Sequence, residues 1–398
     1  MASTIPDAAR TDGTRGSLLE LGLLFLKLGS TAIGGPAVHI SMMEEEIVTS
    51  RQWLTRGEFL DFLGATNLIP GPTSTEMAIY VGRVRAGWRG LLVAGVSFIL
   101  PAALMVGCLA WAYVRYGALP QVGTVLYAVK PVVIVVIAQG ALRLGRAAVK
   151  SIWLAVLGAA AMAAAALGLD PLLTLGAAGG VAGLLHVGFE RGRRNLGAGS
   201  LATASGVAIA KAVPFSRLLL SLVMLKIGAT MFGGGYVLLA FLRSDLVVRL
   251  GWLTERQLLD AVAIGQVTPG PLFTTATFIG YILGGVAGAV LATVAIFLPA
   301  FALVAFSGPL VPRLRSSPTA GALLDGINVA ALALMVVVSA QLGRTALVDG
   351  FPDRRAPQRS ASVSLSREFG MACGGQRGGG RVALAAGCAS PLNMTGPT

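Results

Sequence analysis

Two copies of one motif pattern run through the chain, and this internal repeat constrains its fold more than any other feature. A constant offset of 199 positions aligns residues 27–72 with residues 226–271 without a gap. The matches include rare residue types, such as Trp53-Leu54-Thr55 on Trp252-Leu253-Thr254. Beyond these motifs the offset becomes 198 and the alignment continues. Self-similarity of this kind indicates a duplicated structural unit, so we expect two homologous repeats.

The composition places these repeats in a lipid bilayer. Hydrophobic residues make up 55% of the chain and charged residues only 12%, and the mean hydropathy is +0.77. Several apolar stretches reach the roughly 20 residues that a membrane helix needs. We therefore expect an all-α polytopic membrane protein. Its apolar segments are residues 17–33, 59–81, 90–114, 124–142, 152–167, 172–187, 218–241, 258–282, 286–306 and 320–342.

The same composition excludes several other classes of protein. The formal net charge is +13, but the basic residues are mostly arginines in short loops between apolar runs, a pattern that orients membrane helices and does not indicate nucleic-acid binding. Cys108, Cys373 and Cys388 are unclustered, and His39 and His186 are the only histidines, so we expect no metal site and no disulfide framework. Nucleotide-binding and metal motifs are absent from the sequence, so we expect no cofactor and no enzymatic activity.

The repeat also sets the expected domain boundaries. These are a polar segment at 1–16 without a signal-peptide cleavage site, a first repeat at 17–188, a basic linker at 189–216, a second repeat at 217–349 and a polar tail at 350–398. After Arg146 the first half has two more apolar spans, whereas after the equivalent Arg344 the chain runs into the tail, so the second repeat looks incomplete. Either the tail is a lineage-specific disordered segment, or an altered reading frame or gene end has replaced the last spans. The repeat favours the second interpretation.

The distribution of arginines bears on the orientation of the two repeats. In the first half, basic residues gather at Arg83–Arg89, whereas the equivalent loop of the second half is uncharged. The loop after Arg115 carries one arginine, whereas its counterpart carries Arg313 and Arg315. The positive charge thus changes sides between the halves, which favours inverted repeats. A count of six spans in the first half, with both of its ends cytoplasmic, would instead make the repeats parallel.

Two features at equivalent positions predict an anion site. Lys27 and Lys226 sit inside apolar segments, where an ammonium group usually faces a cavity or a partner, although it can also reach the membrane surface. Glycine turns follow these lysines and end the helix, and a new helix N-terminus after such a turn presents N–H groups that favour an anion. The alternative for the turns is close helix packing. The turns consist of Gly34, Gly35 and Pro36 in the first copy and Gly233, Gly234 and Gly235 in the second.

A Pro-Gly-Pro sequence interrupts one apolar segment in each copy. Two prolines that flank a glycine cannot continue a helix, and half-helices that meet at such a break often form a substrate site. A structural kink is the alternative. Nearby amides and hydroxyls can bind oxyanion oxygens. The predicted substrate-binding residues here are Asn67, Pro70, Gly71, Pro72 and Thr73 in the first copy and Gln266, Pro269, Gly270 and Pro271 in the second.

Three acidic residues are candidates for proton coupling. Asp61 and Asp260 each lie nine positions before a Pro-Gly-Pro sequence, and Glu76 follows the first one, with Thr275 as its counterpart. Carboxylates inside membranes often relay protons, but Asp61 and Asp260 can equally be helix caps or structural ion-pair partners. We interpret the run Glu44-Glu45-Glu46 as a solvated stretch at the membrane interface.

These ordered motifs resemble the chromate transporter family over about residues 18–350. The resemblance rests on Phe25-Leu26-Lys27-Leu28-Gly29, Gly34-Gly35-Pro36, Trp53-Leu54-Thr55 and Asn67 to Pro72, and on their second copy. It implies a multi-pass protein of the bacterial inner membrane that exports chromate, driven as an antiporter by the proton gradient, and confers chromate resistance. The alternatives are a transporter of sulfate or another oxyanion and an inactive, truncated membrane protein. Whether the chain forms a homo-oligomer stays open.

Overall fold

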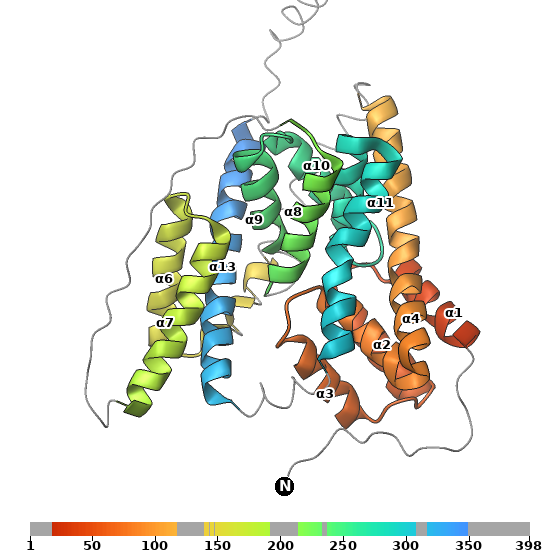
Figure 1. Cartoon of the computed structure of the whole chain (residues 1–398), viewed down its shortest axis with the longest axis horizontal. Helices are drawn as coiled ribbons and strands as arrows, with labels where there is room; N and C mark the ends of the chain where they lie inside the picture. Colours follow the sequence, from red (N-terminus) through yellow and green to blue (C-terminus); the bar gives the residue numbers. More distant parts are fainter. Residues whose placement is uncertain are drawn as a thin grey trace, which may run out of the picture. The chain divides into compact units, whose positions relative to one another are not determined.

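The computed structural model of the chain describes residues 18–117, 139–142, 144–146, 148–191, 214–232, 237–307 and 317–348, and within these residues all regular structure is helical (Figure 1). Among the described helices, three stretches are long and apolar enough to cross a membrane by length and composition, namely Thr73–Tyr116, Leu272–Phe306 and Pro318–Gln341. Two apolar helices are shorter, Ile152–Ala166 and Pro171–Val187. These helices confirm the predicted fold class. The predicted N-terminal segment, most of the linker and the tail lie outside the described residues.

The helices follow the same order in the two copies. The first copy contains α1 (Leu18–Thr31), α2 (Pro36–Glu44), a π-helical turn η1 (Glu45–Ser50), α3 (Arg56–Thr66) and α4 (Thr73–Tyr116), and continues with α6 (Ile152–Ala166) and α7 (Pro171–Arg191). The second contains α8 (Arg217–Thr230), α9 (Leu238–Leu242), a π-helical turn η3 (Arg243–Arg249), α10 (Glu255–Val267), a 3₁₀ turn η4 (Leu272–Thr274), α11 (Thr275–Phe306) and α13 (Pro318–Val348).

The same local devices start the short third helix of each copy. The Thr55 hydroxyl accepts a hydrogen bond from the Glu58 amide, and the Glu58 carboxylate accepts one from the Thr55 amide. Thr254 and Gln257 form the same reciprocal pair at the start of α10. Each pair satisfies two N–H groups that have no partner within the helix. The threonine of each Trp-Leu-Thr sequence therefore caps the N-terminus of the helix that follows it.

Each long helix is a hairpin with a short and a long arm. Non-helical backbone at Ala86-Gly87 separates residues 73–85 of α4 from residues 88–116, and Gly284-Gly285 divides α11 in the same way. The arms of α4 touch at Gly82 and Gly90, where a Cβ on either glycine would clash with the backbone carbonyl of the other. Gly280 and Gly288 make the same contact in α11. Glycine is therefore required where the two arms meet.

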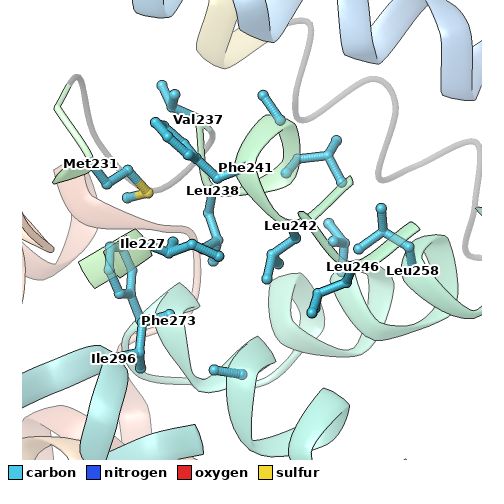
Figure 2. Close-up of a cluster of buried hydrophobic side chains, with 14 of the residues drawn as sticks. Ile227, Met231, Val237, Leu238, Phe241, Leu242, Leu246, Leu258, Phe273 and Ile296 are labelled. Carbon is cyan, nitrogen blue, oxygen red and sulfur yellow. The ribbon is translucent and has the colours of Figure 1, made fainter. Parts of the chain in front are cut away.

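Equivalent apolar side chains build the interior of each copy. The second-copy cluster in Figure 2 includes the fully buried Ile227, Leu242, Leu246, Leu258 and Ile296. In the first copy the buried residues at the same repeat positions are Leu28, Met43, Ile47, Phe59 and Phe98. The side chains differ in shape but stay apolar, which close packing tolerates when the total volume is kept. The first helix of each copy packs through a glycine, Gly29 on Phe98 and Gly228 on Ile296.

The two copies run in opposite directions. The long arm of α4 lies against the long arm of α11, and the ring centroids of Trp88 and Phe306 are 6.3 Å apart. Further along α4, Gly95 meets Phe301, which precedes Phe306 on α11. The two arms occupy equivalent repeat positions, so equivalent helices are antiparallel. A pseudo-twofold axis that relates antiparallel spans lies in the membrane plane, which is the inverted arrangement that the arginine distribution favours.

Helices at the two ends of the repeats also pack together. α13 of the second copy contacts α6 and α7 of the first copy, as Figure 1 shows. The contact is close because Gly326 faces the backbone of Ala178, and Gly179 faces Ile327. Small residues at such positions let membrane helices approach each other. The last described helix of the second repeat is thus buried against the first.

Candidate functional site

The predicted helix breaks are present at three of the four motifs. α1 ends at Thr31, and Gly34 and Gly35 have φ values of +118° and +82° before Pro36 opens α2. Gly233, Gly234 and Gly235 lie outside the described residues. The first Pro-Gly-Pro sequence separates α3 from α4 and the second separates α10 from η4, with φ values of +148° at Gly71 and +98° at Gly270. These φ values are accessible to glycine and costly for other residues.

Each Pro-Gly-Pro turn binds the end of the first helix of the other copy. The Gly71 amide donates a hydrogen bond to the Met231 carbonyl, with N and O 2.9 Å apart. The Gly270 amide donates to the Ala32 carbonyl, also at 2.9 Å. These four positions are related by the offset of 199, so the two bonds are symmetric. We call this pair of contacts the crossing. The crossing places the Pro-Gly-Pro turn of each copy next to the residues that precede the glycine turn of the other copy.

A buried histidine supports one half of the crossing. The Nε2 atom of His39 lies 3.1 Å from the Ala32 carbonyl oxygen, the same oxygen that the Gly270 amide binds. A carbonyl only accepts hydrogen bonds, so Nε2 carries the proton. The second copy has Leu238 at this position, so the support is specific to the first copy.

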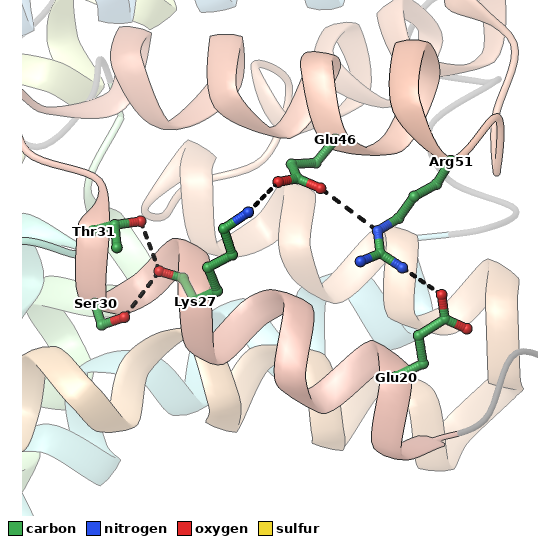
Figure 3. Close-up of polar contacts among 6 residues, drawn as sticks. All are labelled: Glu20, Lys27, Ser30, Thr31, Glu46 and Arg51. Atoms are coloured by element: carbon green, nitrogen blue, oxygen red, sulfur yellow. Dashed lines mark hydrogen bonds and ion pairs between the residues drawn. The ribbon is translucent and has the colours of Figure 1, made fainter.

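Both predicted lysines are held by carboxylates 19 positions further on. In Figure 3 the Lys27 ammonium points at Glu46, and the Nζ and Oε1 atoms are 2.6 Å apart. Arg51 contacts the other oxygen of Glu46 at 3.6 Å and also pairs with Glu20 on α1. The Lys27 ammonium group holds the pKa of Glu46 below its usual range. Glu46 is thus one member of an ion-pair chain between α1 and η1.

The second copy repeats this pair in a more buried form. The Lys226 Nζ atom lies 2.6 Å from Oδ2 and 2.8 Å from Oδ1 of Asp245, whose side chain is only 2% exposed, and Arg249 contacts the same Oδ1 atom at 3.1 Å. The Lys226 side chain is 28% exposed, against 62% for Lys27. Burying a carboxylate is costly unless it is paired, and here two cations pair with it. The two lysines therefore have the same partner type in different environments.

The three predicted acids lie in three different environments. Asp61 on α3 is exposed, and its equivalent Asp260 on α10 is buried and accepts a hydrogen bond from Tyr113 at 3.0 Å. Glu76, at the start of the short arm of α4, is fully buried beside Gly71. The structure therefore brings Glu76 to the crossing, and it places Asp260 at a contact between the copies.

The remaining predicted ligands flank the Pro-Gly-Pro turns. Asn67 follows the last residue of α3 and is exposed, and Thr73 is the first residue of α4 and is half-buried. Gln266 is half-buried near the end of α10. Pro72 and Pro271 are buried, whereas Pro70 and Pro269 are half-buried. The motif residues of each copy thus line both sides of one turn.

Glu46, Asp245 and His39 are the residues that sequence reasoning missed. The repeat offset places Glu46 on Asp245, so a carboxylate recurs 19 positions after each lysine. That recurrence is a signal that could have identified both ion pairs. The interpretation of the acidic run Glu44-Glu45-Glu46 as solvated holds for the exposed Glu45 and does not describe the paired Glu46. Nothing in the sequence marks His39, because the second copy has no histidine there.

Comparison with known proteins gives a consistent result. The family model described as "Chromate transporter" matches residues 19–184 and 218–389. The second matched segment extends to residue 389, whereas the sequence motifs predict a resemblance only to about residue 350. The chain is 33% identical to a chromate transport protein of Cupriavidus metallidurans over 345 residues, which cover 84% of each chain.

Two further relatives are similar over most of their length. A chromate transport protein of Pseudomonas aeruginosa is 33% identical over 363 residues, 87% of this chain and 84% of that protein. A probable chromate transport protein of Synechococcus elongatus is 32% identical over 344 residues, 84% of this chain and 86% of that protein. No solved structure is significantly similar to the chain. The chain belongs to the chromate transporter family.

Proposed function

We propose that the chain exports chromate across the bacterial inner membrane, driven by the proton gradient, and so confers chromate resistance. The observation that carries the proposal is the crossing, where Gly71 and Gly270 each bind the opposite copy. Helix breaks at membrane depth are tolerated where protein or a water-filled cavity satisfies the backbone. Membership of the family and the chromate transport function named for its relatives support the choice of substrate.

The chemistry of the crossing suits a tetrahedral dianion. In the first copy, α2 begins at Pro36 directly after the glycine turn, and the short arm of α4 begins at Thr73 directly after the Pro-Gly-Pro sequence. The first N–H groups of a helix have no acceptor within the helix, and the N-terminus favours negative charge. Asn67, Thr73 and Gln266 add side-chain donors beside the turns. We propose these groups, with the glycine turns, as the ligands of the chromate oxygens.

The lysine pairs give this site a means of responding to the anion. A dianion near Lys226 competes with Asp245 for the same ammonium group, and one near Lys27 competes with Glu46. Exchange of one carboxylate partner for an oxyanion keeps the ammonium group neutralised. We propose that the lysines alternate between the two partners, so that substrate binding loosens the tie between α1 and η1, or between α8 and η3.

The proposal is tested by transport into inside-out membrane vesicles that contain the full chain. Chromate should accumulate when a proton gradient is imposed, and sulfate should compete because it has the same charge and shape. Vesicles without the protein are the control for leakage. No accumulation above that control, with the protein confirmed in the membrane, would contradict chromate export. Accumulation of sulfate that chromate does not inhibit would assign another oxyanion.

Exchanging the two charges of the Lys226–Asp245 pair tests whether the lysine binds the substrate or only stabilises the fold. Lys226→Ala should abolish transport, and the double variant Lys226→Asp with Asp245→Lys should restore the ion pair and the stability without restoring transport. A merely structural pair would recover both. Transport that survives in both Lys27→Ala and Lys226→Ala would remove the lysines from the site. Membrane insertion is verified for each variant before transport is compared.

A further inference from the structure

Buried polar atoms without partners gather at one side of the crossing. In the described part of the chain, both carboxylate oxygens of Glu76 and the hydroxyl of Thr75 are buried and have no hydrogen-bond partner. A Cβ at Gly71 would overlap the Glu76 Oε1 atom, so the carboxyl group lies directly against the Pro-Gly-Pro turn. Buried polar groups in proteins are nearly always paired, so this cluster requires a functional explanation.

The second copy does not leave such atoms open. At the equivalent positions the Thr274 hydroxyl donates to the Pro271 carbonyl and the Thr275 hydroxyl donates to the Leu272 carbonyl, each at 2.8 Å. The backbone of the turn therefore satisfies both side chains locally. The asymmetry between Glu76 and Thr275 is the main chemical difference between the two Pro-Gly-Pro turns.

A line of polar side chains leads away from Glu76 along the short arm. Tyr80 and Arg83 follow at helical spacings of four and seven residues, on the same face as Glu76. The Tyr80 hydroxyl is hydrogen-bonded to the Ser307 hydroxyl, and Ser307 donates to the Val304 carbonyl at 3.0 Å. Because Ser307 uses its proton for that carbonyl, the Tyr80 hydroxyl is the donor to Ser307.

The line ends at the turn of the α4 hairpin. Arg83 donates to the carbonyls of Val304, at 2.6 Å, and Ala305 near the end of α11, and its guanidinium lies over the Trp88 ring at 5.5 Å. Arginine and tryptophan together are typical of a membrane–water interface. In the second copy the positions of Tyr80 and Arg83 are occupied by Phe278 and Tyr281, so the polar line exists in the first copy only.

Most other charged groups on the elements that pack against α4 pair with residues other than Glu76. An ionised carboxylate is costly to bury without a partner, so this conformation suits the protonated acid. Asp61 on α3 and Arg256 on α10 are exposed, and Tyr281 is the titratable residue of α11. The pairs are Lys27 with Glu46, Arg51 with Glu20, Arg56 with Glu44, Thr55 with Glu58, Arg243 with Glu255, Tyr113 with Asp260 and His39 with Ala32.

We propose that Glu76 carries the coupling proton, and that Tyr80 and Ser307 conduct it between the crossing and the membrane surface at the Arg83 turn. This inference rests on the proposed transport function and narrows its coupling site to one carboxyl group in one repeat. Glu76 has no hydrogen-bond partner in this conformation, so its carboxyl group must first rotate toward Tyr80. Its proton then passes to the Tyr80 oxygen while the Tyr80 proton passes to the Ser307 oxygen and the Ser307 proton passes to water at the membrane surface. The reverse sequence reloads the acid, so no charge or proton is left over.

Coupling at this position has a simple electrostatic basis. A charged Glu76 beside Gly71 repels an oxyanion at the crossing, whereas a protonated Glu76 does not. Anion affinity and proton affinity are therefore linked, and each ligand strengthens the binding of the other by the same factor. One proton and a dianion that move together carry one net negative charge, so the electrical part of the proton gradient, which is negative inside, would drive their export. Asp61 and Asp260 are not needed for this linkage.

The test uses the full chain in liposomes, with labelled chromate and a pH-sensitive dye inside. Chromate exchange between equal concentrations on both sides reports binding and movement without net proton transfer. Glu76→Gln should keep exchange and lose the proton movement that accompanies net transport. The matched control is Glu45→Gln, the same change at an exposed carboxylate, which should keep both. Tyr80→Phe should slow net transport, with KM for chromate unchanged and exchange retained.

The outcomes separate this inference from the function on which it rests. Absence of chromate exchange by the unmodified chain contradicts the transport function itself. Exchange by the unmodified chain together with normal proton coupling in Glu76→Gln overturns the inference alone, as does coupling that follows sodium instead of pH. If Glu76→Gln does not reach the membrane, Glu76→Asp decides. A shifted pH profile of net transport supports the role of Glu76, and an unchanged profile overturns it.

Discussion

The backbone amide of Gly270 donates to the carbonyl of Ala32 across 2.9 Å, and this bond has a symmetric partner between Gly71 and Met231. Each Pro-Gly-Pro turn thus donates a backbone hydrogen bond to the end of the first helix of the other copy. Neither helix break therefore has all its backbone hydrogen bonds within its own copy. Contacts of this reciprocal kind arise where a twofold axis relates two equivalent surfaces. Mutations at the crossing are therefore expected to act on both copies together.

The first prediction concerns the space at the crossing. In Gly270→Ala the new methyl group would lie 2.5 Å from the Ala102 Cβ and 2.9 Å from the Gly29 carbonyl oxygen. We expect a loss of about 1–3 kcal/mol from overpacking, in addition to the strain of a positive φ, and a loss of transport. Gly251→Ala is the control, because its φ of +63° is also positive and no atom lies within 4 Å of the added Cβ. Thermal unfolding in detergent measures both, and equal losses would contradict the prediction.

The second prediction concerns the direction of the repeats. Gln52 and Gly251 are equivalent, exposed and both have positive φ, at 52° and 63°. After replacement of the native cysteines by alanine, Gln52→Cys and Gly251→Cys should react with a membrane-impermeant maleimide from opposite sides of the membrane. The antiparallel long arms of α4 and α11 are the reason. Labelling of both positions from the same side would show parallel repeats.

The third prediction compares the two lysine pairs. Lys226→Met leaves the buried Asp245 with Arg249 alone, so we expect destabilisation of about 3 kcal/mol, as for other broken buried pairs. Lys27→Met removes a largely exposed partner and should cost about 1 kcal/mol or less. Unfolding by detergent titration, followed by tryptophan fluorescence, measures the difference. Losses of the same size at both sites would show that burial of the pair does not matter.

The fourth prediction is a pH dependence that belongs to Glu46. The Lys27 ammonium lowers the pKa of this carboxyl from 4.5, so the folded protein binds fewer protons than the unfolded chain in this range. The pair therefore stabilises fully above about pH 4.5, and its contribution disappears as the pH falls through the lowered value. The stability difference between the unmodified chain and Glu46→Gln should shrink across that window. A stability difference that does not change with pH would show that the charge of Glu46 does not stabilise the fold.

Much of the fold follows from the repeat and from residue types with strong local preferences. Glycine and proline fix the backbone at Gly34-Gly35-Pro36 and at both Pro-Gly-Pro sequences, so the helix breaks could be predicted from local chemistry alone. The length of the helices was less predictable. The apolar segment at residues 17–33 contains a helix of only 14 residues, shorter than a membrane span, because the glycine turn ends it early.

The site itself depends on contacts between residues far apart in sequence. Nothing local indicates that Gly71 meets Met231, or that Tyr80 meets Ser307, because both contacts join the two copies. The recurring carboxylate indicates Asp245 as a partner of Lys226, but no sequence pattern predicts the π-helical turn η3 that carries Asp245. Local chemistry thus locates the breaks, and only the packing of one copy on the other identifies which breaks meet.

The differences between the copies acquire a meaning from their opposite orientation. Lys226 is the less exposed lysine and Asp260 the buried aspartate, whereas the side chains of Lys27 and Asp61 are exposed. A lysine–carboxylate pair occurs in both units, so an exchange of the two conformations would keep this type of interaction. The exchanged molecule would expose the opposite membrane face. Alternating access would then arise from the duplication itself, without a dedicated hinge.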